Sequence, residues 1–242
     1  FVGIFEKLIC RIFLMPPTKQ EIYLKELQNY CWDNGFNTEP MRNERLAFFA
    51  HLVAEKNKTV NLISRKDVES IIENHIFISA YITKFLPEKV TRFLDIGTGG
   101  GFPGIPLAIM RPELRGVLAD STGKKIEAVK EFIDKLKLSN VVAENARVES
   151  PEFIEKHRGT FDLIVSRAVV PIIILFRYAL PLVKDKAFIV AMKGGDLDEE
   201  FQKAELKYKS FIKKSTVYEL AYKPTNLRNK KGKKLVVIEL QK

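Results

Sequence analysis

The hydrophobic pattern of the chain changes once, near Pro87. Before it, apolar residues recur every three or four positions, as at Leu46, Phe49 and Val53, which is the spacing of one helical face. After it, short aliphatic runs alternate with amphipathic stretches such as 124–136, which is typical of strands alternating with helices. Strands are predicted at 92–95, 116–120, 141–144, 163–166, 186–192, 215–220 and 234–240.

Strands that alternate with helices form a parallel, doubly wound sheet, with the ligand crevice at the carboxyl ends of the strands. No clear helix separates the last two predicted strands, which favours an antiparallel closing strand. We therefore predict an α/β fold with a Rossmann-like sheet. A helical N-terminal region is expected over 15–88 and the sheet domain over 89–242.

Residues 1–14 are mostly apolar, with Lys7 and Arg11 interspersed. The segment is too short to span a bilayer and lacks a small-residue cleavage site. We expect it to be an upstream-translated or expression-derived segment, and a short amphipathic contact helix is the alternative. No later segment approaches transmembrane length.

Forty Lys and Arg against thirty Asp and Glu give the 242 residues a formal charge of +10. This charge favours a polyanionic partner, with nucleic acid ahead of an acidic membrane surface, although charge alone does not choose between them. Cys10 and Cys31 form no metal-binding cluster and no disulfide framework, so we expect a reducing cytoplasm and no metal.

A glycine-rich segment follows the first predicted strand. Gly99, Gly101 and Gly104 satisfy the dinucleotide fingerprint, which indicates a nicotinamide or flavin cofactor, and a turn that binds nothing is a further alternative. Asp95 argues against a pyrophosphate, since two anions in one partly desolvated crevice repel each other. S-adenosylmethionine is cationic and has no phosphate. Asp95, Gly97, Gly99 and Gly101 give the pattern D-x-G-x-G-x-G of class I methyltransferases.

Acidic residues follow the second and third strands. Asp120 can accept both hydroxyls of an adenosine ribose, and a helix N-cap formed with Ser121 and Thr122 is a compatible alternative. In the segment containing Val148 and Glu149, a backbone N–H can face the adenine ring and the carboxylate can accept from its amine. Taken alone, this segment is also compatible with a solvated turn.

The fourth strand ends in Ser166-Arg167-Ala168, without the Asp-Pro-Pro-Tyr of amine methylation or the Pro-Cys of C5 methylation. Guanine N7 needs neither deprotonation nor covalent activation, so in-line displacement by positioning is sufficient. We predict Arg167, Arg147 and Lys193 as catalytic residues that bond guanine O6 or order phosphates, and structural ion pairs are the alternative.

Two further features carry weaker signals. His75 lies on or beside an apolar helical face, where a packed, hydrogen-bonded histidine is favoured over a catalytic one. The segment 226–234 is strongly basic, which is compatible either with a solvated loop or with an edge that binds phosphates. The candidate RNA-binding residues in it are Arg228, Lys230, Lys231, Lys233 and Lys234.

Together, 94–106, 119–121, 147–149, 166–169 and 192–194 closely resemble the ribosomal RNA small subunit methyltransferase G family, also called glucose-inhibited division protein B. The resemblance runs from about Asn57 to the end. It implies N7 methylation of a guanine, nucleotide 527 in the family's numbering, in the 530 loop of 16S rRNA. It also implies cofactor contacts at Gly97, Phe102, Val148, Glu149 and Arg167, with 120–122 at the ribose.

Asn61, Leu62 and His75 match the family's helical region, whereas two positions depart from it. Ile63 stands where the family usually has Thr, and Ile78 where it usually has Asp. We expect these departures to bear on RNA engagement and not on the cofactor site. The expected partner is 16S rRNA or the small ribosomal subunit, bound by a monomer. The alternatives are a non-catalytic, cofactor-binding RNA-associated protein and an NAD-dependent oxidoreductase.

Titration calorimetry separates the two cofactor classes. The chain is expected to bind S-adenosylhomocysteine and not NAD, because Asp95 disfavours a pyrophosphate. Tight binding of NAD without binding of S-adenosylhomocysteine would reverse the assignment.

Overall fold

The computed structural model describes residues 16–167, 170–195, 197–223 and 232–242, and its first part is helical. Local signals set the helix starts. Thr18 and Glu21 form a capping box at the start of α2 (Lys19–Asp33), and Pro40 opens α3 (Pro40–Lys56). The elements are α2 (Lys19–Asp33), α3 (Pro40–Lys56), the 3-10 turn η1 (Arg65–Asp67), the π-helical turn η2 (Ile72–Phe77), α4 (Ile78–Tyr81) and η3 (Ile82–Phe85).

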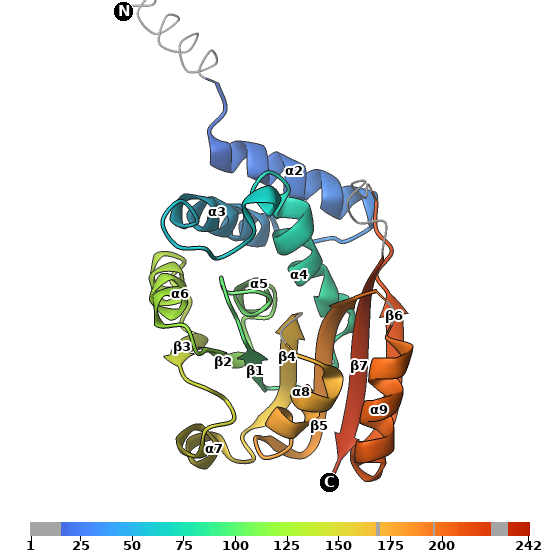
Figure 1. Ribbon diagram of the computed structural model, residues 1–242. Helices are drawn as coiled ribbons and strands as arrows, with labels where there is room; N and C mark the ends of the chain where they lie inside the picture. The colour runs from blue at the N-terminus through green and yellow to red at the C-terminus, as the bar shows by residue number, and fades with distance from the viewer. Residues whose placement is uncertain (1–15, 168–169, 196, 224–231) are drawn as a thin grey trace, which may run out of the picture.

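Within the described ranges, seven strands form one central sheet in the order β3-β2-β1-β4-β5-β7-β6 (Figure 1). Neighbours from β3 to β5 are parallel, whereas β7 runs antiparallel to both β5 and β6. The predicted Rossmann-like sheet with an antiparallel closing strand is confirmed. The strands are β1 (Arg92–Ile96), β2 (Arg115–Asp120), β3 (Val141–Asn145), β4 (Phe161–Arg167), β5 (Val183–Gly194), β6 (Ile212–Glu219) and β7 (Lys233–Gln241).

Apolar side chains leave the sheet on both faces, as the centre of a three-layer fold requires. Phe93 packs in one hydrophobic core with residues of α5 and α6, whereas the next residue, Leu94, packs in a second core with α8 and α9. The remaining helices are α5 (Gly104–Met110), α6 (Gly123–Lys135), α7 (Pro151–His157), α8 (Ile172–Ala179), α9 (Asp198–Tyr208) and η4 (Lys209–Phe211).

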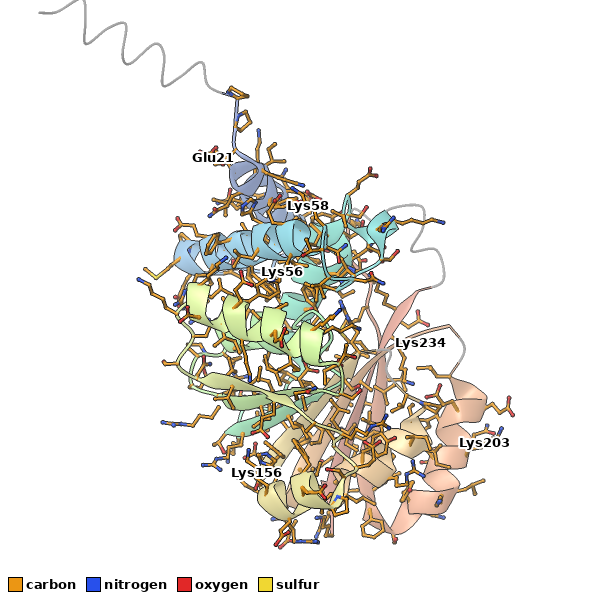
Figure 2. The ribbon with its side chains drawn as sticks, turned by 60° about the vertical axis from the view of Figure 1, so that its left-hand side comes forward. Glu21, Lys56, Lys58, Lys156, Lys203 and Lys234 are labelled. Carbon is orange, nitrogen blue, oxygen red and sulfur yellow. The ribbon has the colours of Figure 1, made fainter. Side chains whose placement is uncertain are left out.

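The N-terminal helices share the first of these cores, since their buried residues are continuous with those of α5 and α6. Polar contacts fix α3 over these helices. Arg42 donates to the carbonyl oxygen of Met110 at 2.7 Å, and Lys56 pairs with Glu131 at 2.5 Å. Figure 2 shows Lys56 facing α6 from the end of α3. The predicted division at 88/89 stays a prediction.

Ile63 and Ile78 lie inside this core, at 5% and 0% exposure. Neither side chain reaches the surface, so neither is placed to touch RNA directly. Their effect on RNA engagement stays a prediction, and any such effect has to act through the packing of the helical region.

Asp162 joins the amino-terminal ends of three adjacent strands, opposite the ligand edge. It is 8% exposed. Its carboxylate accepts from the backbone N–H groups of Thr91 and Arg92 and from the Thr91 hydroxyl and Lys184 ammonium, at 2.7–2.9 Å. Burial acts to raise the pKa of Asp162, but these donors outweigh it and hold the pKa below its ordinary value.

Asp162→Ala is expected to lower the free energy of unfolding by about 3 kcal/mol at pH 7, because buried donors lose a shared acceptor. Urea denaturation measures the change. Asp185→Ala is the matched control, since Asp185 is exposed on β5 near the same end of the sheet, and its effect should stay within about 0.5 kcal/mol.

Wild type and Asp162→Ala also test the lowered pKa of Asp162. Because the pKa of Asp162 is lower in the folded protein, its stabilisation is complete above the unfolded pKa of about 4 and is lost as the pH falls through the folded value. The stability gap between wild type and Asp162→Ala should therefore shrink below pH 4. A gap that stayed constant down to pH 2.5 would contradict this assignment.

Candidate cofactor pocket

The glycine loop between β1 and α5 forms the floor of the candidate site. Gly97, Gly99 and Gly101 have φ values of 70°, 57° and 94°. Residues that carry a Cβ rarely adopt these φ values, so the loop needs glycine at these positions. The N–H groups of Gly97 and Thr98 donate to the carbonyl oxygen of Ala119 at 2.9 and 3.0 Å, which anchors the loop to β2.

Asp95 lies beneath this loop and not at its mouth. It is fully buried, and its Oδ2 accepts from the Thr98 hydroxyl at 2.7 Å and from the N–H of Gly104 at 2.9 Å. Alternation along β1 puts Asp95 on the same face as Phe93, toward α5. The expectation that its carboxylate faces the ligand therefore disagrees with this geometry. A contact of Asp95 with the cofactor stays a prediction.

The other oxygen of this carboxylate, Oδ1, is buried without a hydrogen-bond partner among the described residues. Burial raises the pKa of Asp95 to about 7, although the bonds from Thr98 and Gly104 and the charge of Arg167 act in the opposite direction. The loop thus rests on a carboxyl group that titrates near neutral pH.

A pocket opens at the carboxyl ends of β1, β2 and β3, the edge predicted from the strand pattern. The structure brings several predicted cofactor residues together there, while their contacts with a ligand stay predictions. The described lining residues are Ile96, Gly97, Ala119, Asp120, Ser121, Ala146, Arg147, Val148, Glu149, Val170 and Tyr178.

Asp120 stands at the centre of the pocket's polar side. One oxygen accepts from the N–H of Gly99 at 3.0 Å and the other from the N–H of Thr122 at 2.8 Å. Thr122 is the N-cap residue of α6. The carboxylate therefore links the glycine loop to the start of α6, and each oxygen keeps a further acceptor position.

Sequence reasoning missed Val170 and Tyr178, which complete the pocket from the segment after β4 and from α8. Tyr178 is half-buried and packs on the core beneath the pocket. No spacing signal connects α8 with the ends of β1 to β3, so only the folded chain reveals this wall.

The three predicted catalytic residues lie in different surroundings. Arg147 lines the rim with a side chain that is 75% exposed. Arg167, at the end of β4, stacks on Phe102 with its Cζ atom 4.8 Å from the ring centroid. Phe102 is only 2% exposed, and neither it nor Arg167 belongs to the described lining of the pocket.

Lys193 forms the ion pair that was its alternative assignment. Its ammonium lies 2.7 Å from Glu200 and donates to the carbonyl oxygen of Val170 at 2.6 Å. Glu200 also accepts from the N–H of Ile172 at 2.6 Å. Lys193 therefore holds the segment that carries Val170, and its catalytic role stays a prediction.

The predicted RNA-binding edge is described only in part, because Arg228, Lys230 and Lys231 lie outside the described residues. Lys233 is turned inward, with its ammonium 5.9 Å from the Tyr222 ring centroid and 3.4 Å from Oδ1 of Asn74. Burial lowers the pKa of Lys233 to about 8. Lys233 is therefore partly buried, and its contact with RNA stays a prediction. Lys234 follows near the start of β7 (Figure 2).

Comparison with known proteins assigns the chain to a family. A family model described as rRNA small subunit methyltransferase G matches residues 42–227. The chain belongs to this family. It is 42% identical over 182 residues to the ribosomal RNA small subunit methyltransferase G of Chlorobium chlorochromatii (strain CaD3), covering 74% of each chain. The predicted family and the methyltransferase class are confirmed.

Solved structures support the fold alone. The O-methyltransferase from Bacillus cereus, crystallised with SAH, superposes with a TM-score of 0.58 at 16% identity, covering 90% of this chain and 97% of that one. A SAM-dependent methyltransferase from Aquifex aeolicus gives 0.54 at 17% identity, covering 77% and 98%.

Within the described ranges, no helix is both long and apolar enough to cross a bilayer. No group of three or more His, Cys, Asp and Glu side chains there is placed to hold a metal ion.

The pKa of Asp95 predicts an unusual pH dependence. Because the folded pKa of about 7 exceeds the unfolded value, the native state binds the extra proton, and stability falls as the pH rises from about 4 to about 7. Asp95→Asn keeps an acceptor for Thr98 and Gly104 and cannot ionise. Its free energy of unfolding, measured in urea between pH 5 and 8, should lack this decline. An identical slope in both proteins would contradict the assignment.

Proposed function

We propose that this chain transfers a methyl group from S-adenosylmethionine to N7 of a guanine in the 530 loop of 16S rRNA. The observation that carries the proposal is the family match, which runs from the helical region through most of the sheet domain, residues 42–227. A relative named ribosomal RNA small subunit methyltransferase G aligns over 74% of this chain and 74% of its own length. The N7 position comes from the resemblance and from the chemistry at the end of β4.

The pocket suits the adenosine part of this cofactor. Apolar side chains of Ile96, Val148 and Val170 offer a bed for the adenine ring, while Asp120 and Glu149 offer acceptors for ribose hydroxyls and an exocyclic amine.

S-adenosylmethionine supplies a methyl group on a positively charged sulfur. The side chains at the end of β4 offer no nucleophile that could activate the acceptor base covalently. Ser166 is buried, and its hydroxyl donates to the carbonyl oxygen of Ile96 at 3.1 Å. Cys31 is buried in α2, and burial raises the pKa of its thiol to about 11. An acceptor with a free lone pair, such as guanine N7, needs only positioning here.

In this proposal, Arg167 contacts the cofactor, as the family resemblance implies, and together with the exposed Arg147 it orients the guanine O6 or its phosphates beside the cofactor. Lys193 contributes by holding the wall of the pocket at Val170. The proposed substrate places the enzyme in the cytoplasm, where it acts as a monomer on rRNA or on a ribosomal particle.

Transfer of tritium from labelled S-adenosylmethionine to small ribosomal subunits that lack the mark tests the proposal. Wild type should label 16S rRNA, and aniline cleavage of the treated rRNA should map the modified guanine to the 530 loop. Cofactor binding without transfer would favour a non-catalytic RNA-associated protein. Transfer to a base other than guanine would overturn the N7 assignment.

Gly99→Ala and Gly159→Ala form a matched pair for this assay. Their φ values are 57° and 60°, and an added Cβ meets no atom closer than 3.9 Å at either site. Each change should therefore cost about 1 kcal/mol of stability. Only Gly99 belongs to the glycine loop, so Gly99→Ala should lower transfer at least tenfold while Gly159→Ala stays within twofold. Equal losses would assign the effect to stability.

A further inference from the structure

A π-helical turn of the N-terminal region reaches the carboxyl edge of the sheet. The turn η2 covers Ile72–Phe77, and single π-helical turns are rare and frequently lie at functional sites. His75 in this turn has a side chain that is only 12% exposed. Its ring centroid lies 5.1 Å from that of Phe102, at the exit of the glycine loop. The helical region thus contacts the exit of the glycine loop through this turn, as it also does through Phe49 of α3, whose ring centroid lies 5.0 Å from that of Phe102.

The guanidinium of Arg167 is held on three sides. Its Nη2 lies 2.8 Å from Nδ1 of His75, and its Nη1 donates to the carbonyl oxygen of Asn74 at 3.4 Å. The ring of Phe102 supports it from below, 4.8 Å from Cζ. Both hydrogen-bond acceptors come from consecutive residues of η2. The orientation of an arginine on β4 is therefore set by the N-terminal region.

The direction of the hydrogen bond fixes the state of His75. A guanidinium has only donors, so Nδ1 must accept, and the imidazole is neutral with its proton on Nε2. Burial, and then the charges of Arg167 and Lys233, lower the pKa of His75 to about 2. Nε2 faces the carboxylate of Asp67 at 3.7 Å. A neutral acceptor suits a buried cation, whereas a protonated imidazole would repel it.

We propose that His75 is a positioning residue for the methyltransferase reaction: its Nδ1 orients Arg167 toward the cofactor, and so makes cofactor binding depend on the helical region. This inference rests on the proposed function, because it concerns the same pocket. Arg167 has several rotatable side-chain bonds, and loss of the Nδ1 acceptor releases its guanidinium from the geometry that Phe102 and Asn74 only partly define.

The test compares His75→Leu with His75→Asn, two side chains of nearly equal size. The Asn oxygen can take the place of Nδ1 as an acceptor, whereas Leu cannot. His75→Leu should raise the KM for S-adenosylmethionine and the Kd for S-adenosylhomocysteine about tenfold, because a hydrogen bond to a charged group is lost. His75→Asn should restore both constants to within about threefold of wild type.

His75→Gln provides a second comparison if His75→Leu does not fold, because its amide lies farther from the backbone and misses the Nδ1 position. It should behave like Leu and not like Asn. A merely structural histidine predicts that all three variants lower the thermal midpoint and leave KM and Kd unchanged, and that result would overturn the inference. Failure of wild type to methylate rRNA would instead defeat the proposed function, since the Kd comparison needs no RNA.

Discussion

A buried carboxylate holds the shape of the glycine loop. Oδ2 of Asp95 accepts from the Thr98 hydroxyl near the beginning of the loop and from the N–H of Gly104 where α5 begins. A Cβ on Gly104 would stand 2.2 Å from Leu118, so α5 approaches β2 as closely as glycine allows. Asp120 completes the arrangement by accepting from the N–H of Gly99. The pocket depends on these hydrogen bonds, because Gly97, its lining residue from the loop, has no side chain to hold the backbone in place.

Hydrophobic periodicity was sufficient to predict the fold class, because strands and helices of a doubly wound sheet differ in period. Hydrophobic periodicity does not locate the ends of helices and strands where the terminal residues are polar. The fifth strand was expected from 186, but β5 begins at Val183, since the exposed residues Lys184 and Asp185 give no apolar signal for a strand that pairing with its neighbours extends. The π-helical turn at Ile72–Phe77 left no trace in the pattern, because its apolar residues also fit an ordinary helix.

The candidate site was predictable where it follows strand ends and unpredictable where it depends on tertiary contacts. Asp120 ends β2, and Val148 and Glu149 lie shortly after β3, so the carboxyl ends of these neighbouring strands bring the three residues into one pocket. Tyr178 lies on α8, which is distant in sequence from the other lining residues on β1 to β3, and so could not be predicted. The burial of Asp95 could not be predicted, because a motif gives the residue type but not the face of the strand. The inward turn of Lys233 could not be predicted either, because a basic run does not reveal which of its members is partly buried.

The single hydrophobic core beneath α2, α3, α5 and α6 has a consequence for the order of synthesis. Helix α3 has its apolar face covered in part by α5 and α6, which are translated later, and Arg167 later still meets its acceptors on η2. The native packing of the N-terminal region is therefore incomplete until these elements have emerged. Its completion waits for the sheet domain, and the cofactor edge is assembled only when both parts of the chain have emerged.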